Sequence, residues 1–148
     1  MNLSQFSKRM TIHADNLPGE VNRVMKRVGL AVHQTIVLAT PVDTGAARSN
    51  WRVNLNAPSG DVVQPYSPGR KLGLGESSNA QGAITHGQNV IGRRKPSQDI
   101  VIDNNLGYIG DLNSGTSAQA PAMFVETAID TASHAIQNIR IDTGKGFV

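Results

Sequence analysis

The sequence predicts an α+β fold: a small antiparallel sheet packed against two helices, with a long basic insertion loop. Three observations lead to this prediction. Apolar residues recur at helical spacing over residues 17–40 and again over residues 121–139, and short alternating segments lie between the two stretches. Residues 65–98 lack any strong periodic pattern. The chain of 148 residues is expected to form a single domain over residues 1–148.

The first predicted helix covers residues 17–40. Its apolar side chains fall on one stripe, made of Val21, Val24, Met25, Val28, Val32, Ile36 and Ala39. Asn16 is expected to cap the start of the helix, and Pro18 fits its first turn, where a proline sacrifices no intrahelical hydrogen bond. Pro41 is expected to end the helix, because proline disfavours helical backbone in the residue before it.

Residues 41–45, Pro-Val-Asp-Thr-Gly, are predicted to form a turn in which Pro41, Asp43 and Gly45 are the structural residues. A second Asp-Thr-Gly stands at residues 142–144. This tripeptide is the catalytic signature of aspartic proteases, in which two carboxyl groups share one proton. Asp43 follows a predicted helix, whereas the protease residue follows an apolar strand. An aspartic protease is therefore kept only as a distant alternative.

Short strands are predicted in the middle of the chain. Residues 48–56 alternate between apolar and polar, which predicts a half-buried strand and places Trp51 in the core. Residues 61–64 fit a short strand, and residues 99–103 fit a strand bounded by polar residues. Residues 106–112 are expected to continue as strand or as a bend.

Residues 65–98 are interpreted as an insertion loop that serves in assembly. The segment holds five basic residues, which are the interface candidates Arg70, Lys71, Arg93, Arg94 and Lys95, and one acidic residue, Glu76. A short helix fits residues 79–91, but Gly82 and Gly87 are expected to break it. Because long loops are usually functional or disordered, removing residues 70–95 is expected to leave a folded monomer.

The second predicted helix ends near residue 139. Gly115 lies in a loop over residues 113–117, and Pro121 is expected to open the helix, so both are assigned structural roles. Residues 142–148 are expected to fray.

The composition excludes several kinds of chemistry. The sequence contains no cysteine, which excludes disulfides, thiolate metal sites and a cysteine nucleophile. The four histidines share no metal-binding or catalytic spacing: His13, His33, His86 and His134. No catalytic, metal or cofactor residue is assigned, and no cofactor is expected. No stretch approaches the roughly 18 apolar residues of a membrane span, so no membrane partner is expected.

Several short motifs together resemble one protein family. The first group comprises residues 40–45, Thr-Pro-Val-Asp-Thr-Gly, and residues 48–51, Arg-Ser-Asn-Trp. The second comprises residues 104–108, Asn-Asn-Leu-Gly-Tyr, then Leu-Asn-Ser-Gly-Thr-Ser at 112–117, and Gln-Ala-Pro at 119–121. Their order and spacing resemble the tail-completion or neck (head–tail joining) proteins of long-tailed bacteriophages, the group that includes minor tail protein Z.

This resemblance implies a structural protein of the virion and no enzymatic activity. Such proteins form a homo-oligomeric ring, commonly a hexamer, at the head-proximal end of the tail. Their partners are the tail terminator, the tail tube and the head connector, and DNA passes through the lumen. The implied location is the virion neck, and the host cytoplasm during assembly. The family often has Glu where this chain has Asn113, so Asn113 is also an interface candidate, and often Pro at Gly107.

Two further functions remain open at this point. A tail terminator or head-closure connector would share the ring geometry and is the nearest alternative. A small DNA-binding protein is the more distant one, because Lys and Arg residues cluster within residues 65–98. Salt-dependent DNA binding by the isolated subunit would identify the latter.

Overall fold

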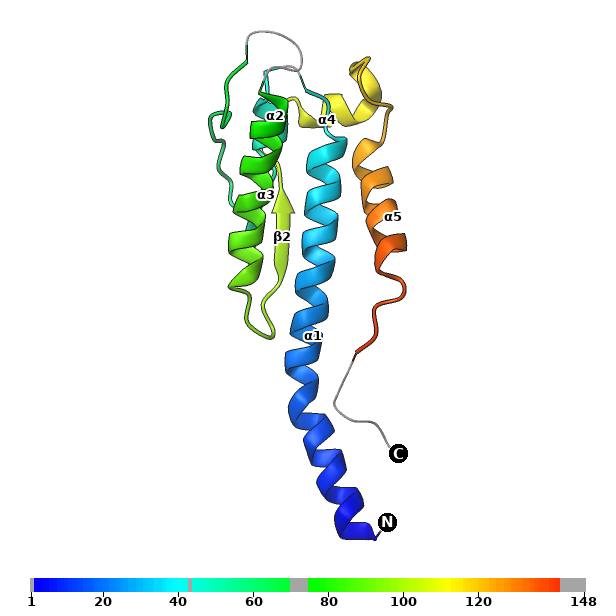
Figure 1. The fold of residues 1–148 in the computed structure, drawn as a ribbon. Helices are drawn as coiled ribbons and strands as arrows, with labels where there is room; N and C mark the ends of the chain where they lie inside the picture. The colour runs from blue at the N-terminus through cyan, green and yellow to red at the C-terminus, as the bar shows by residue number, and fades with distance from the viewer. Residues whose placement is uncertain (1, 43, 70–74, 142–148) are drawn as a thin grey trace.

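A computed structural model describes residues 2–42, 44–69 and 75–141, and its fold is α+β (Figure 1). Three long helices lie side by side, with α1 between α3 and α5. A two-stranded antiparallel sheet packs beside them. The predicted α+β class is therefore confirmed, but three long helices form the helical layer where two were expected.

Helix α1 spans Leu3–Ala39 and is much longer than the predicted helix over residues 17–40. A capping box fixes its start. The side-chain oxygen of Asn2 accepts a 2.9 Å hydrogen bond from the backbone N–H of Gln5, and the Gln5 side chain accepts one of 3.0 Å from the N–H of Asn2. These reciprocal bonds satisfy backbone donors that a helix start otherwise leaves without partners.

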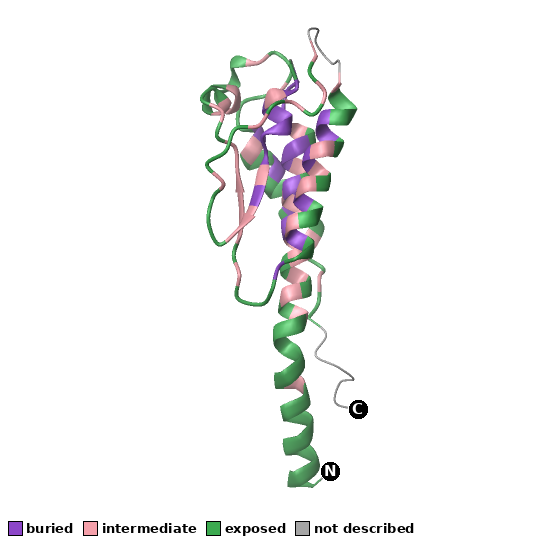
Figure 2. Ribbon diagram, turned by 90° about the vertical axis from the view of Figure 1, so that its left-hand side faces the viewer, coloured by how far each residue is buried: buried purple, intermediate pink, exposed green. Residues whose placement is uncertain are grey.

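Pro18 lies inside α1, so the prediction that Asn16 caps the helix and that Pro18 occupies its first turn is wrong. A proline at this position deprives the carbonyl of Ala14 of its helical partner. Residues 2–12 and 14–19 are all exposed (Figure 2), so that carbonyl lies in a stretch surrounded by solvent. Solvation explains why the helix tolerates the proline.

The short helix α2 (Ala46–Ser49) occupies the start of the segment predicted as a strand over residues 48–56. Strand β1 is correspondingly shorter, at Arg52–Leu55, and it pairs with β2 (Ile100–Asp103). The register pairs Arg52 with Asp103, Val53 with Ile102, Asn54 with Val101 and Leu55 with Ile100. Residues 61–64 run without regular structure, so the short strand predicted there is absent.

Helix α3 spans Glu76–Gly92, within the segment predicted to be an insertion loop over residues 65–98. That prediction is corrected, because α3 packs against α1 and β1 as part of the body. Its buried residues include Ala80, Ala83 and Ile91. Because α3 belongs to the packed body, removal of residues 70–95 is now expected to disrupt the fold.

Two glycines that were expected to break α3 are close-packing positions. A Cβ atom at Gly82 would overlap the ring of Tyr66, and one at Gly87 would overlap the imidazole ring of His33. Only a residue without a side chain lets these two rings approach the helix so closely. The glycines therefore cost some intrinsic helix stability and allow aromatic side chains to pack on α3.

Helix α4 (Ile109–Asp111) and the π-helical turn η1 (Leu112–Thr116) occupy most of the segment predicted to continue as strand or bend. Helix α5 (Phe124–Ile136) lies within the predicted helix over residues 121–139. Pro121 stands in the turn before α5 and does not open it, which corrects the expected start.

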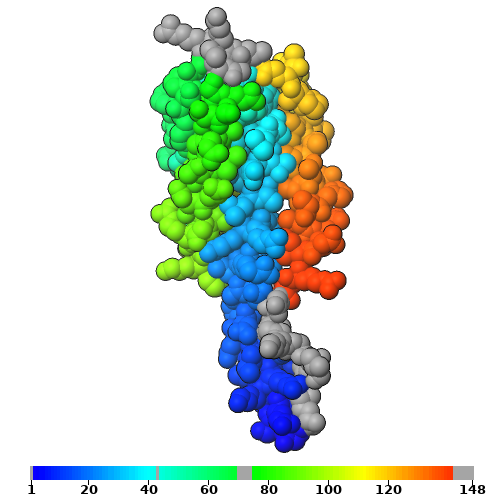
Figure 3. Space-filling view, in the orientation of Figure 1, coloured from blue at the N-terminus to red at the C-terminus, as the bar shows by residue number. Residues whose placement is uncertain are grey.

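The core lies where α1, α3 and α5 meet the start of β1. Its central cluster contains Ile36, Val37, Trp51, Ala80, Ala83, Phe124 and Ala128. Three of these seven side chains are alanines, which allow the helices to approach one another closely. Figure 3 shows α3, α1 and α5 as one continuous body from which the N-terminal half of α1 extends.

Candidate functional site

A cluster of buried polar side chains lies where the end of α1, α2 and the start of α3 meet. It consists of Arg48, Ser49, Asn50 and Asn79, none more than 6% exposed, and is called the polar cluster below. Three of the four come from the segment Arg-Ser-Asn-Trp that was part of the family resemblance. Buried polar groups destabilise a fold unless they are hydrogen-bonded, so their partners reveal what the cluster does.

Arg48 joins the end of α1 to the start of α3. Its guanidinium donates hydrogen bonds to the carbonyl oxygens of Thr40 at 2.8 Å and Leu38 at 3.3 Å. A helix end leaves such carbonyls without intrahelical partners, and a cation there also interacts favourably with the helix dipole. The Nη1 atom also donates to Oε1 of Glu76 at 2.9 Å.

The two asparagines hold the extended segment that follows β1. Asn50 accepts a 2.7 Å hydrogen bond from the N–H of Val63 and donates one of 2.8 Å to its carbonyl. Asn79 makes the same pair of bonds with Ser67, each 2.8 Å. The hydroxyl of Ser49 donates to Asn79 at 2.9 Å. Each side-chain amide thus satisfies both the N–H and the carbonyl of one backbone residue, as a neighbouring strand would.

Trp51 is 6% exposed and lies in the core, with hydrogen bonds at both its side chain and its backbone. The indole N–H donates to the hydroxyl of Thr40 at 2.7 Å. The Nε2 atom of His33 lies 3.0 Å from the carbonyl oxygen of Trp51. Burial is the largest influence on His33 and lowers its pKa. The imidazole is therefore favoured in its neutral form, with Nε2–H as the donor.

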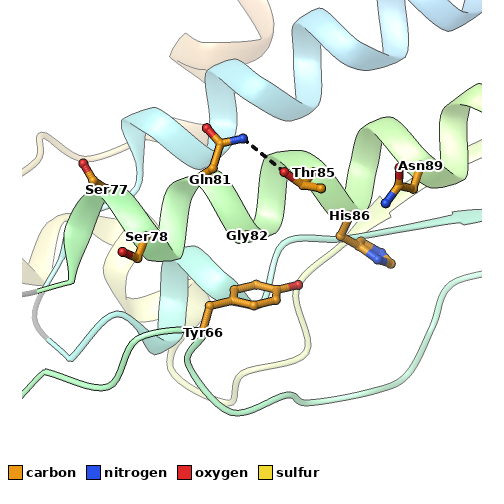
Figure 4. Close-up of a pocket in the computed structure, with 8 residues that line it drawn as sticks. All are labelled: Tyr66, Ser77, Ser78, Gln81, Gly82, Thr85, His86 and Asn89. Atoms are coloured by element: carbon orange, nitrogen blue, oxygen red, sulfur yellow. Dashed lines mark hydrogen bonds between the residues drawn. The ribbon is translucent and has the colours of Figure 1, made fainter.

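An open groove of about 820 Å³ runs along the outer side of α3 (Figure 4). It is lined by Tyr66, Ser77, Ser78, Gln81, Gly82, Thr85, His86 and Asn89. The Gln81 amide donates a 3.1 Å hydrogen bond to Thr85 across the top of the helix in this view. The lining offers hydroxyl and amide groups, which suit hydrogen bonding to a polar surface.

His86 borders this groove but is engaged with strand β1. Its Nε2 atom lies 3.3 Å from the nitrogen and 3.2 Å from the oxygen of Val53, so the imidazole occupies the free edge of the strand. Burial, followed by the positive charge of Arg52, lowers the pKa of His86. The geometry assigns this histidine to holding the strand edge.

Two of the predicted turn residues, Pro41 and Gly45, lie beside the polar cluster. Pro41 is buried directly after the end of α1. Gly45 has φ +84°, and a Cβ atom there would overlap the Asn79 side chain. Gly115 also has a positive φ, +96°, in the turn before α5. Asp43 lies outside the described residues.

The basic interface candidates do not share one environment. Arg94 is 7% exposed, and its guanidinium donates to the side chain of Asn22 on α1. Its neighbours Arg93 and Lys95 are exposed. The remaining two candidates, Arg70 and Lys71, lie outside the described residues.

Asn113 holds the first turn of α5 through side-chain hydrogen bonds. Its side-chain oxygen accepts a 3.0 Å hydrogen bond from the N–H of Val125, and its amide donates to Glu126 at 2.9 Å. The hydrogen bond from Asn113 is the main cause of a lowered pKa at Glu126. The backbone carbonyl of Asn113 also accepts a bond from the N–H of Met123.

The sequence interpretation missed the exposed half of α1. Leu3, Met10, Leu17 and Val21 are 83%, 46%, 43% and 39% exposed, and are called the α1 stripe below. They are seven, seven and four residues apart, which keeps them on one side of the helix. This periodicity and the capping-box residues Asn2 and Gln5 are the features of the sequence that indicate a helix start at Leu3.

Residues 2–42, 44–69 and 75–141 contain no group of three or more His, Asp or Glu side chains placed to hold a metal ion. Within the same ranges, no helix has both the length and the apolar character needed to cross a bilayer. Comparisons with protein-family models, curated proteins and solved structures gave no match to this chain.

Proposed function

We propose that this chain is a structural subunit of the neck of a tailed bacteriophage, where copies of it form a ring that completes the tail and joins it to the head. The main support for a ring is the α1 stripe, a row of exposed apolar side chains. Most helix stability in proteins comes from burying one face, yet these four apolar side chains of α1 are exposed. Large apolar side chains exposed together typically mark an interaction surface.

The motifs that resemble neck proteins support the same proposal. Thr40 and Gly45 of the first motif contact the polar cluster, and residues 48–50 belong to it. Residues 112–117 precede α5 at the same end of the molecule (Figure 1). The exposed half of α1 lies at the opposite end. A subunit with the polar cluster at one end and the α1 stripe at the other has surfaces for two different layers of an assembly.

The first experiment measures self-association of the full chain. The purified protein is examined by light scattering after size exclusion and by negative-stain electron microscopy, over a range of concentrations. A closed oligomer of constant subunit number is the expected result. A protein that stays monomeric at all concentrations contradicts the ring.

The second experiment tests the location. A phage that carries this gene is grown with the gene deleted, and its particles are compared with those of the parent by cryo-electron microscopy. Tails that lack density at the head-proximal end and fail to join heads are expected, with recovery when the chain is supplied. Complete infectious particles without the chain contradict the proposal. Density at another ring position identifies a tail terminator or head-closure connector.

A further inference from the structure

We propose that a belt of basic side chains at one end of the three-helix body binds the phosphate backbone of double-stranded nucleic acid. The belt forms where α1 passes between the C-terminal ends of α3 and α5 (Figure 1). It comprises six side chains and is called the basic belt below: Arg23, Lys26, Arg27, Arg93, Lys95 and Arg140. All six belong to one chain, so this inference goes beyond the neck assignment and does not require the ring.

Hydrogen bonds between distant segments bring the basic belt together. The ammonium group of Lys26 donates a 2.8 Å hydrogen bond to the carbonyl oxygen of Gly92, the last residue of α3. The guanidinium of Arg23 donates one of 3.2 Å to the carbonyl oxygen of Arg140, beyond the end of α5. These contacts join residues that lie 66 and 117 positions apart in the sequence. Folding therefore gathers the basic side chains of three segments at one level of the molecule.

The three segments hold more than the whole net positive charge of the chain. Residues 20–27, 92–99 and 137–141 contain seven basic residues, which are the basic belt and Arg94, against two acidic ones. Their net charge is +5, whereas the rest of the chain holds seven basic and nine acidic residues, a net charge of −2. Charge of one sign concentrated in this way attracts an anionic partner to that place on the surface.

Neutral groups hold several of the belt cations in place. Lys26 donates to a backbone carbonyl, and the Nε–H of Arg93 donates to the carbonyl oxygen of Asn89 at 3.2 Å. In the part of the chain that the structure describes, the one ion pair of the basic belt joins Arg23 to Glu20 at 3.0 Å. A neutral acceptor positions a cation without cancelling its charge. The net charge of the basic belt thus stays available to a ligand.

Arg94 adds a buried positive charge beside the basic belt. It is 7% exposed, and its guanidinium donates to the side-chain oxygen of Asn22, which is a neutral group. Its Nε atom is buried and has no hydrogen-bond partner among the described residues. A buried charge without a counter-charge destabilises a fold. An anion bound over the basic belt would offset this cost.

The arrangement suits a long polyanion better than one small anion or an acidic protein. The side chains come from three segments across the body, so a single phosphate ion cannot contact them all (Figure 1). Duplex nucleic acid carries a negative charge about every 1.7 Å along its axis. Protein surfaces usually interleave both signs of charge. Four of the six belt residues are arginines, whose guanidinium groups form paired hydrogen bonds with phosphate oxygens.

The composition of the three segments favours a duplex over a single strand. Residues 20–27, 92–99 and 137–141 contain no Phe, Tyr or Trp. Proteins bind single strands largely by stacking the bases on aromatic rings, whereas the bases of a duplex are already stacked inside it. Contacts to phosphates carry no sequence information. Binding is therefore expected to be independent of base sequence.

The first experiment measures binding of the purified full chain to fluorescent nucleic acids by anisotropy. Duplex DNA, duplex RNA and single-stranded DNA of equal length are compared at about 50 and about 200 mM salt. With about four phosphate contacts, the affinity for a duplex should fall roughly a hundredfold over this range. Binding to either duplex supports the proposal, and the tighter one identifies the preferred nucleic acid. No binding at the lower salt, or equal affinity for the single strand, overturns it.

A matched pair of double variants tests whether the basic belt makes the contact. Arg27→Gln with Lys95→Gln removes two exposed belt charges, and Lys8→Gln with Arg9→Gln removes two exposed charges elsewhere on the chain. The belt variant should bind the duplex roughly tenfold more weakly and with a smaller salt dependence, while the control should bind like the parent. Equal weakening in both variants would show an effect of total charge and overturn the proposal.

The belt substitutions should leave the fold intact. Among the described residues, no hydrogen bond or ion pair holds the side chain of Arg27, Lys95 or Arg140. Circular dichroism and the thermal midpoint of the belt variant should therefore match those of the parent. Arg140→Gln is an independent belt variant with a side chain that is also exposed. Unchanged duplex binding in both folded belt variants contradicts the role of the basic belt.

Competition with polyglutamate separates recognition of phosphates from recognition of carboxylates. At equal concentrations of negative charge, most of the duplex should remain bound. Displacement of the duplex would show that the basic belt fits an acidic protein at least as well, and would overturn the proposal. All these experiments measure direct binding by the purified chain. Their failure is therefore distinguishable from failure of the neck assignment, which is read in phage particles.

Discussion

The indole of Trp51 donates a 2.7 Å hydrogen bond to the hydroxyl of Thr40, and that hydroxyl donates one of 2.7 Å to the carbonyl of Ile36. The side chain of Thr40 therefore links the last turn of α1 to Trp51, the residue that precedes β1. Both groups are buried, so the hydroxyl is the partner of an indole N–H that solvent does not reach.

Replacing Thr40 by Val is expected to destabilise the protein by about 1–3 kcal/mol, the usual cost of leaving a buried donor without a partner. Urea unfolding followed by Trp fluorescence measures the change. Thr35→Val is the matched control, because Thr35 donates to Ala31 within the same helix but accepts no indole bond. Equal losses in the two variants would show that the bond to Trp51 contributes nothing.

Gly45→Ala should be destabilising by about 1–3 kcal/mol, because a residue with a Cβ is strained at φ +84° and would overlap Asn79. Gly60→Ala provides the comparison. Gly60 also has a positive φ, +68°, but nothing lies within 4 Å of a Cβ there. The difference between the two unfolding free energies measures the packing against Asn79, and a difference of zero contradicts it.

The stability of the fold should fall as the pH drops below about 6.5, the ordinary pKa of a histidine in an unfolded chain. The pKa values of His33 and His86 are both lowered in the folded protein. Below this pH the unfolded chain therefore binds protons that the folded chain does not. The two neutral histidines contribute fully to the free energy of unfolding above this pH, and that contribution is lost as the pH falls below it.

His33→Gln should reduce this pH dependence, because glutamine keeps a donor for the Trp51 carbonyl but does not titrate. Unfolding free energies at pH 8 and pH 5 are compared for both proteins. His134→Gln is the control, since the His134 side chain is 65% exposed. A parent protein equally stable at both pH values would contradict the prediction.

Gly87→Ala should destabilise the protein although alanine favours helices, because the new methyl group would overlap the ring of His33. Gly92→Ala, with nothing within 4 Å, should be neutral or slightly stabilising. Thermal unfolding compares the two. Stabilisation by Gly87→Ala would mean that α3 does not approach His33 as described.

Removing residues 70–95 should unfold the chain, because it deletes the whole of α3, including the buried residues Ala80, Ala83 and Ile91. Far-ultraviolet circular dichroism and proteolysis measure the loss of structure. A deletion variant with the thermal stability of the parent would show that α3 is a dispensable insertion.

The sequence predicted features that depend on local chemistry. Pro41 marks the end of α1 correctly, because its effect acts on the residue directly before it. The positive φ of Gly45 follows from turn composition. The alternation that begins at Trp51 placed that side chain in the core.

Features that depend on contacts across the chain were not predictable in this way. Gly87 reads as a helix breaker until His33 is known to occupy the space beside it. The partners of Asn50 and Asn79 lie 13 and 12 residues away along the chain, so composition gives no sign of them. Arg94 looks like part of a basic surface, yet its partner is Asn22, 72 residues earlier.

Pro18 has a mechanical consequence for the long helix. Because it removes one backbone hydrogen bond from α1, the bending stiffness of the helix is lowest near that residue. Pro18 lies near the end of the exposed stretch of α1, just before the first partly buried residues of the body. A sideways force on the N-terminal half would therefore bend α1 at this point and leave the geometry of the core unchanged. The exposed half of α1 can therefore change its direction relative to the core without any rearrangement of the core.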